Sequence, residues 1–213
     1  MRTFIALLVT AATFAAFGQG KTRFENDSLH LVYYTPDTTL LRAADAPLAG
    51  QGVSSVLMPL SVQLVADLYV GTSSSSLSLI SSTVFGTQAG RISGANVLLP
   101  LGMPGGSQLW FQVQVRDSAY ASETLSLASG SYGGHSVIFT SIPGSAIAYN
   151  SIVNPNPPTS STWPPGDFDM STQTGLPGAR GAIRVSLIPE PGVVVLALLG
   201  VCAWRPRRNR GRR

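Results

Sequence analysis

Apart from Trp110, residues 108–116 alternate between apolar and polar side chains, and this period of two constrains the fold more than any other feature of the chain. One face of the segment would carry Leu109, Phe111, Val113 and Val115. The opposite face would carry Trp110, Gln112, Gln114 and Arg116. Such a pattern predicts a β-strand with one face packed on a core and the other face in water.

Further segments with strand-like composition or alternation predict a chain that is mainly β. They cover residues 29–34, 61–70, 77–80, 91–99, 123–127, 135–140 and 181–188. Glycine-rich turns separate them, so we expect an antiparallel β-sandwich or jelly-roll-like body over residues 19–187. Proline lacks an N–H and has a fixed φ, so the proline-rich stretch that begins at residue 154 predicts a loop, which we extend over residues 154–180.

Charge and cysteine content argue against a nucleic-acid-binding body and against a disulfide-linked one. The chain holds 14 Lys and Arg residues against 10 Asp and Glu, but half of the basic residues lie before residue 19 or after residue 204. The body is therefore slightly acidic and has no basic stripe for a nucleic-acid partner. The single cysteine, Cys202, lies outside the body, so no disulfide is expected there. No pattern of residues indicates a cofactor.

The N-terminus has the order of features that is typical of a secretory signal peptide. Arg2 supplies a positive charge, residues 4–17 form an apolar run, and Ala16 and Gly18 are small residues at the positions that a signal peptidase reads. We expect residues 1–18 to form an apolar helix that is cleaved after Gly18. The Sec machinery would then export the chain, and signal peptidase would remove the signal peptide.

The C-terminus consists of three ordered segments. A rigid turn, Pro189-Glu190-Pro191, comes first. An apolar run follows over residues 192–204, whose main members are Gly192, Val193, Val194, Val195, Leu196, Leu198, Leu199 and Trp204. The basic tail over residues 205–213 holds Arg205, Arg207, Arg208, Arg210, Arg212 and Arg213.

The apolar run predicts a short transmembrane helix. As a helix it would span about 20 Å, against about 30 Å of membrane hydrocarbon. The arginines that follow have long side chains, which can reach the headgroups and lengthen the effective span. They also satisfy the positive-inside rule, so we expect the tail in the cytoplasm and the body on the exported side.

These three terminal segments resemble the PEP-CTERM sorting signal of Gram-negative bacteria. The resemblance implies that Pro189, Glu190 and Pro191 are recognised by exosortase, a membrane protease and transpeptidase. It also implies that residues 192–204 anchor the chain in the inner membrane and that residues 205–213 retain it there until processing. The body is loosely similar to the exported domain of short PEP-CTERM proteins of Verrucomicrobia and Planctomycetes type, through residues 23–26, 65–71 and 111–117, and those relatives imply no activity.

Candidate catalytic and metal-binding residues are few. The chain has two histidines, His30 and His135, and it has no Gly-x-Ser-x-Gly motif. We interpret His135 as a polar residue at the start of a strand rather than as a catalytic base. Asp167 and Asp169 would suit Ca²⁺, but such a site needs about six oxygen ligands, so we favour a solvated turn and expect no metal.

Aromatic side chains on the body form the basis of an alternative function. Exposed aromatic rings can stack on sugar rings, and the candidates are Trp110, Tyr69, Tyr120, Tyr132 and Trp163. Trp110 stands out because glutamines share its predicted face, although we favour the interpretation that it packs under a neighbouring loop or on a second sheet.

The sequence thus favours an exported, membrane-anchored protein without catalytic activity, which exosortase sorts to the cell surface, the outer membrane or the extracellular matrix. The alternative is a carbohydrate-binding module for exopolysaccharide. A hydrolase is a third and weaker hypothesis, because serine is abundant and any Ser, His and Asp set could arise by chance.

Overall fold

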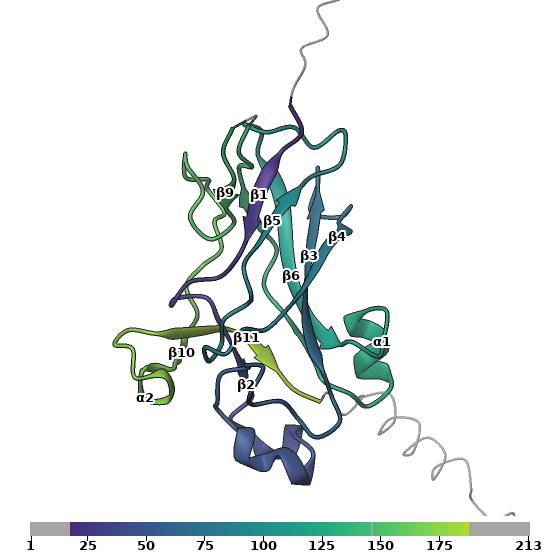
Figure 1. Cartoon of the computed structure of the whole chain (residues 1–213), viewed down its shortest axis with the longest axis vertical. Coiled ribbons are helices and arrows are strands. Elements are labelled where there is room, and N and C mark those ends of the chain that lie inside the picture. Colours follow the sequence, from purple (N-terminus) through teal and green to yellow (C-terminus); the bar gives the residue numbers. More distant parts are fainter. Residues whose placement is uncertain (1–17, 146, 188–213) are drawn as a thin grey trace, which may run out of the picture.

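Strands dominate the part of the chain that the computed structural model describes, residues 18–145 and 147–187 (Figure 1). The strands are β1 (Lys21–Phe24), β2 (Leu31–Tyr34), β3 (Leu64–Gly71), β4 (Ser78–Val84), β5 (Ala95–Leu98), β6 (Leu109–Asp117), β7 (Gly133–His135), β8 (Phe139–Ser141), β9 (Asn150–Ser151), β10 (Phe168–Asp169) and β11 (Arg180–Val185). The short helices are η1 (Thr38–Leu40), η2 (Ala43–Leu48), α1 (Glu123–Ala128) and α2 (Ser171–Thr174). The prediction of a mainly β chain is confirmed.

The largest sheet is built around the strand with the clearest alternation. Its order is β4-β3-β6-β7, and β8 pairs with β6 beside β7. β3 and β6 are antiparallel from Leu64 opposite Asp117 to Gly71 opposite Trp110. The apolar residues of β6 are buried and its polar residues are half-buried on the other face, as the period of two predicts.

Two smaller sheets, β5-β1-β9 and β10-β11-β2, complete the body. Each contains one parallel pair, β1 with β9 and β2 with β11, so the pairing differs from the purely antiparallel arrangement that we expected. Local alternation reports only which face of a strand is apolar, and it carries no information about the direction of a neighbouring strand. The start of β1 and the end of β11 lie at opposite ends of the body (Figure 1).

One core joins the three sheets. Its buried members include Phe24 from β1, Tyr34 from β2, Phe111 from β6 and Ile183 from β11. The proline-rich loop also contributes, because Trp163 is 3% exposed and its ring stacks on Phe139 at 5.0 Å between centroids. Residues 154–167 contain no helix or strand. They are nevertheless packed against the body by this tryptophan.

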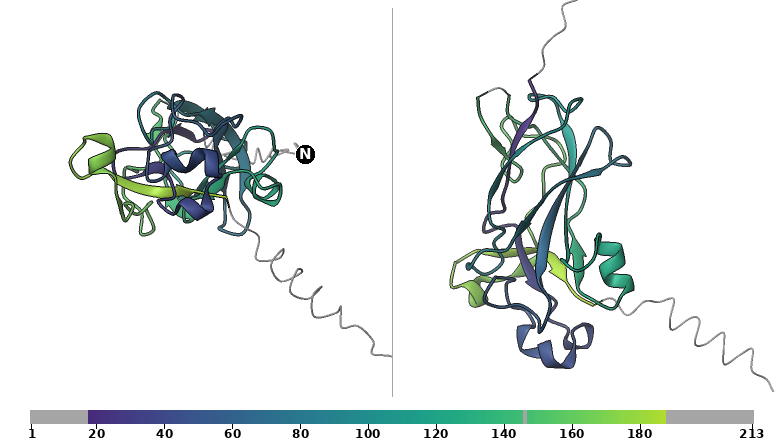
Figure 2. Two further views of the ribbon diagram at one scale, coloured as in Figure 1. Left: turned by 90° about the horizontal axis from the view of Figure 1, so that it is seen from below. Right: turned by 45° about the vertical axis from the view of Figure 1, so that its right-hand side comes forward.

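Residues 123–127, predicted as a strand, form helix α1 instead. Ser122 caps the helix by accepting a hydrogen bond from Leu125 N (3.2 Å), and Glu123 lies in the first turn, where the helix dipole favours a negative charge. The buried residues are Glu123 and Ser126, which are three apart as on one face of a helix. Leu125 and Leu127 imitate strand alternation, but Leu125 is exposed and Leu127 only partly buried. α1 and α2 lie on opposite sides of the body (Figure 2).

Residues 135–140, predicted as one strand, are divided between β7 and β8. Both strands pair with β6, and the exposed Val137 and Ile138 lie between them. Ser136 makes the transition, since its N–H donates to Val113 O (2.8 Å) and its hydroxyl accepts from Val113 N (3.0 Å). From His135 to Phe139 the chain advances four residues while β6 advances three, from Gln114 to Phe111, so one extra residue shifts the register. Alternation in the sequence does not reveal such a shift.

The predictions for the two ends of the chain fall outside the described residues, with Gly18 as the exception. This holds for the signal peptide, the Pro189-Glu190-Pro191 turn, the transmembrane helix over residues 192–204 and the arginine tail. Within the described ranges, no helix is both long and apolar enough to cross a membrane.

Candidate functional site

Trp110 lies on the outer face of the large sheet, away from the core. It is half-buried, and on that face it lies opposite Gly71 of β3 and Thr140 of β8. A Cβ atom on Gly71 would lie 1.9 Å from Ser76 O, so the serine-rich turn after β3 crosses close to this end of the face. The Trp110 side chain is therefore partly covered near this turn and partly exposed to solvent.

Tyr69 lies on the same outer face, where it is opposite Gln112 on β6. Trp110 and Tyr69 are therefore diagonal neighbours across two strands, a relation that places Cβ atoms about 7–8 Å apart. The amide of Gln112 is fixed, because it donates to Ser136 O (3.2 Å) and accepts from Gln114 Nε2 (3.0 Å). Two half-exposed rings beside hydrogen-bonded amides thus lie together on this face, which we call the platform.

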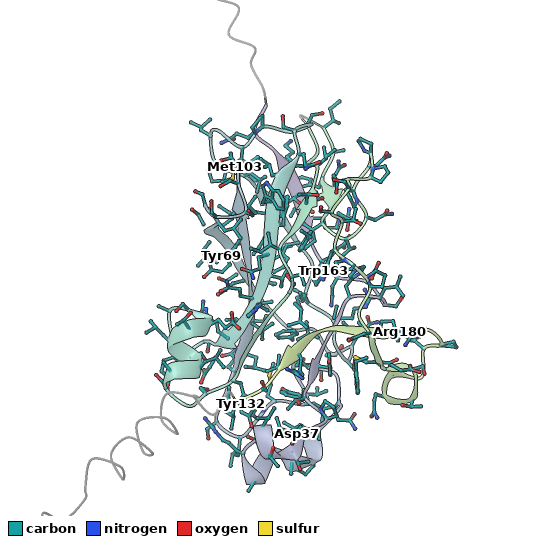
Figure 3. The ribbon with its side chains drawn as sticks, turned by 180° about the vertical axis from the view of Figure 1, so that it is seen from behind. Asp37, Tyr69, Met103, Tyr132, Trp163 and Arg180 are labelled. Atoms are coloured by element: carbon teal, nitrogen blue, oxygen red, sulfur yellow. The ribbon has the colours of Figure 1, made fainter. Side chains whose placement is uncertain are left out.

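Two of the aromatic residues that we considered for sugar contact lie in the interior instead. Trp163 is in the middle of the molecule, and Tyr132 is fully buried (Figure 3). The Tyr132 hydroxyl donates to Asp45 Oδ2 (2.6 Å) and accepts from Arg42 N (3.1 Å). Burial and the neighbouring carboxylate raise the pKa of Tyr132 to about 12. Both rings are structural, and they leave Trp110, Tyr69 and Tyr120 as the partly exposed candidates.

His135 is held by a carboxylate from α1. Its Nδ1 lies 2.8 Å from Glu123 Oε1, and the Glu123 side chain is 9% exposed. This hydrogen bond raises the pKa of His135 above its usual value, while partial burial opposes the rise. The charged pair therefore favours folding at low pH, and its contribution is lost as the pH rises through the pKa of the folded state. Among the residues that the structure describes, no serine hydroxyl hydrogen-bonds to His135.

The other histidine, His30, is 3% exposed and has two partners. Its Nδ1 lies 2.6 Å from Asp27 Oδ1 and its Nε2 lies 2.9 Å from Trp163 O. The same ring is 4.9 Å from the Trp163 ring. His30 therefore fixes the proline-rich loop against β2 and has a structural role.

A hollow of about 610 Å³ lies beside His135, where three strands meet. β7 runs antiparallel to the end of β11, since Gly133 N donates to Ser186 O (3.1 Å) and Ser186 N donates to Gly133 O (3.0 Å). On its other edge β11 pairs with β2, and this places Arg184 opposite Tyr33. Glu123 from α1 and Asp167 from the proline-rich loop complete the polar lining.

The sequence did not predict this hollow. Its polar residues are Tyr33, Glu123, His135, Asp167, Arg184 and Ser186. They come from five separate parts of the chain, and no spacing along the sequence connects them. The one feature of the sequence that could have indicated the hollow is the charged Arg184 on the polar side of an alternating strand. A strand face that is simply in contact with water gives the same pattern.

Asp167 and Asp169 do not form a shared cation site. Asp167 faces the hollow, whereas Asp169 Oδ1 accepts a hydrogen bond from Ser171 N (2.9 Å) at the start of α2. That hydrogen bond lowers the pKa of Asp169. No group of three or more His, Cys, Asp or Glu side chains that could hold a metal ion occurs within residues 18–145 and 147–187. Asp169 therefore forms the Asx turn that we favoured for this segment.

Comparison with known proteins adds no family to this geometry. No protein-family model, no curated protein and no solved structure matches the chain. Three features of the chain itself remain as indications of function. They are the outer platform of Trp110 and Tyr69, the hollow beside His135, and the terminal segments of the sequence.

Proposed function

We propose that the chain is an exported, membrane-anchored protein that an exosortase sorts to the cell surface or extracellular matrix, where it acts without catalysis. The supporting observation is the order of the terminal segments in the sequence: a charged and then apolar N-terminus with small residues at positions 16 and 18, and a C-terminus of Pro189-Glu190-Pro191, an apolar run and six arginines. Between them the described residues form a hydrogen-bonded body, in which Gly20 N donates to Met103 O (2.9 Å) and Leu187 N donates to Leu40 O (2.9 Å).

The same proposal gives the body a mechanical role. We infer that its three sheets act as one sandwich-like unit, since they share a core. β11 lies between β10 and β2 and leads toward the C-terminal segment. A load applied through a C-terminal anchor would pull on a strand that is hydrogen-bonded on both edges. The described body contains no cysteine, so this resistance would not depend on the redox state outside the cell.

Replacing both Pro189 and Glu190 with alanine is expected to abolish sorting, because the turn is the proposed recognition element. The unprocessed chain should accumulate in the inner membrane. Immunoblots of cytosolic, inner-membrane, outer-membrane and medium fractions would measure this, together with mass spectrometry of the mature C-terminus. Pro177→Ala, at an exposed proline of the body, is the control. Unchanged processing of the double variant would contradict the sorting proposal, and a full-length cytosolic wild type would contradict export as well.

A second candidate function is affinity for a polysaccharide, which the platform of Trp110 and Tyr69 favours. Truncating an aromatic anchor at the centre of a binding surface commonly costs about 2 kcal/mol or more, so Trp110→Ala should weaken binding by more than about tenfold. A glycan array followed by titration with the best polysaccharide would measure this. Tyr149→Ala, a partly exposed ring just before β9, is the matched control. Equal binding by wild type and Trp110→Ala would count against the platform.

A further inference from the structure

The hollow beside His135 contains polar groups that the described part of the protein leaves unpaired. The Arg184 guanidinium, the Asp167 carboxylate and the Tyr33 hydroxyl all border it. Among the described residues, none of the three groups makes a hydrogen bond or ion pair. Tyr33 is 7% exposed, whereas Arg184 and Asp167 are open to solvent. Three hydrogen-bonding groups of different kinds thus border one concave surface, which is a feature of ligand sites.

The Tyr33 ring and the floor of the hollow are held in place before any ligand binds. The Tyr33 ring stacks on Phe168 at 4.3 Å between centroids, with 5° between the ring planes. The floor of the hollow is equally rigid, since a Cβ atom on Gly134 would lie only 2.2 Å from Arg184 O. β7 and β11 therefore approach closely along this floor. Preorganised groups lose little conformational entropy on binding, and this favours affinity.

The charges around the hollow nearly balance. Glu123 is hydrogen-bonded to His135, and the lining also holds one further charge of each sign, Asp167 and Arg184. Asp37 also faces Arg184, but its carboxylate already accepts hydrogen bonds from Thr39 N (2.9 Å) and the Thr39 hydroxyl (2.7 Å). The carboxylates would repel an anionic ligand, and the guanidinium and the protonated imidazole would repel a cationic one. The lining thus disfavours a strongly charged ligand of either sign.

A neutral ligand rich in hydroxyl groups fits this lining. Each hydroxyl can donate to a carboxylate such as Asp167 and accept from a guanidinium such as Arg184. Pairs of neighbouring hydroxyls are the recurring feature of sugars. A hollow of about 610 Å³ also lies within the roughly 300–1,000 Å³ range of small-molecule sites.

We propose that this hollow binds one neutral sugar unit through Asp167, Arg184 and Tyr33. The inference rests on the proposed polysaccharide affinity and adds a second binding position to it. On the outer face, His135 lies opposite Gln114, four residues along β6 from Trp110. At about 3.4 Å per residue the two positions are some 14 Å apart, so one polysaccharide chain could contact both.

Isothermal titration of the full chain with uncharged trisaccharides tests the proposal. The probes are cellotriose, maltotriose and mannotriose, with a galacturonate trimer and a glucosamine trimer as charged comparisons. The detergent must be a phosphocholine, because sugar-headed detergents would compete. At least one neutral trisaccharide should bind, and Arg184→Gln and Asp167→Asn should each weaken it by about tenfold or more, since each removes charge-assisted hydrogen bonds.

Matched controls come from the same elements. Arg180→Gln lies on the same strand as Arg184, and Asp169→Asn lies two residues from Asp167 and can retain its turn. Both should bind as the wild type does. Circular dichroism would show that each variant is folded.

Different results would contradict the polysaccharide affinity and the binding of sugar in the hollow. If no polysaccharide or trisaccharide binds the wild type, both the polysaccharide affinity and this inference are wrong. If a polysaccharide binds through Trp110 but the Arg184 and Asp167 variants bind normally, only the hollow is wrong. Binding of a charged trimer in preference to every neutral one would also overturn the assignment of a neutral sugar.

Discussion

Replacing Phe111 with alanine is expected to lower the free energy of unfolding by about 3–5 kcal/mol. Phe111 is fully buried at the middle of the core face of β6, and its ring lies 5.9 Å from that of Phe139. Truncation would remove this packing and leave a cavity that the hydrogen-bonded strands on both sides of β6 prevent from collapsing. The loss is a large part of the total stability of an ordinary domain.

Urea unfolding followed by tryptophan fluorescence would measure this loss, since the buried Trp163 reports on the core. Gln112→Ala is the matched control, because it removes a side chain from the next position of the same strand on the opposite face. We expect it to change the free energy of unfolding by less than about 1 kcal/mol. Equal losses for the two variants would contradict the assignment of β6 faces.

Replacing Arg116 with methionine is expected to cost about 3–5 kcal/mol of stability, because it would leave a buried carboxylate without its counter-ion. Asp67 is completely buried on β3, and its Oδ2 accepts a hydrogen bond from Arg116 Nε at 2.5 Å. The Ser82 hydroxyl donates to Asp67 Oδ1 (2.6 Å) and would be its remaining partner. Arg116 also donates to the carbonyl of Tyr120, so its loss would release the turn before α1.

A double variant separates the cost of an unpaired charge from the cost of lost packing. Asp67→Leu combined with Arg116→Met removes both charges and keeps similar side-chain volume, so it should recover most of the stability that Arg116→Met loses. Urea midpoints of the wild type, both single variants and the double variant complete the cycle. A double variant as unstable as Arg116→Met would show that packing of the arginine side chain, and not its charge, stabilises this face.

The sequence predicted the two central strands well, because each has a continuous apolar face that is buried. β6 alternates throughout between buried and half-buried residues, whereas on the outer face of β3 Asp67 and Gly71 are buried as well. Prediction failed where a local pattern supports two structures. The segment at 123–127 places leucines two apart, but its serine cap and the burial of Glu123 and Ser126 produce a helix. The aromatic residues show the same limit, since Tyr132 and Trp163 are buried while Trp110 is not.

Much less of the hollow could be predicted. Asp167 and His135 were each considered, but for cation binding and for catalysis and not as parts of one site. The site exists because β11 pairs in parallel with β2 and runs beside β7, which brings Tyr33, His135 and Arg184 onto adjacent strands. Parallel partners are separated by long stretches of chain, so no short-range pattern records the pairing.

By itself, the sequence determined the terminal segments, the cysteine-free body with its slight acidic excess, and the apolar face of each long strand. These properties depend on composition and on local periodicity, which are complete in the linear chain. The tertiary structure alone decided which faces became neighbours, and so which polar groups of the described body border a common hollow. Periodicity specifies the side on which a residue lies, whereas long-range packing selects the strand that lies next to it.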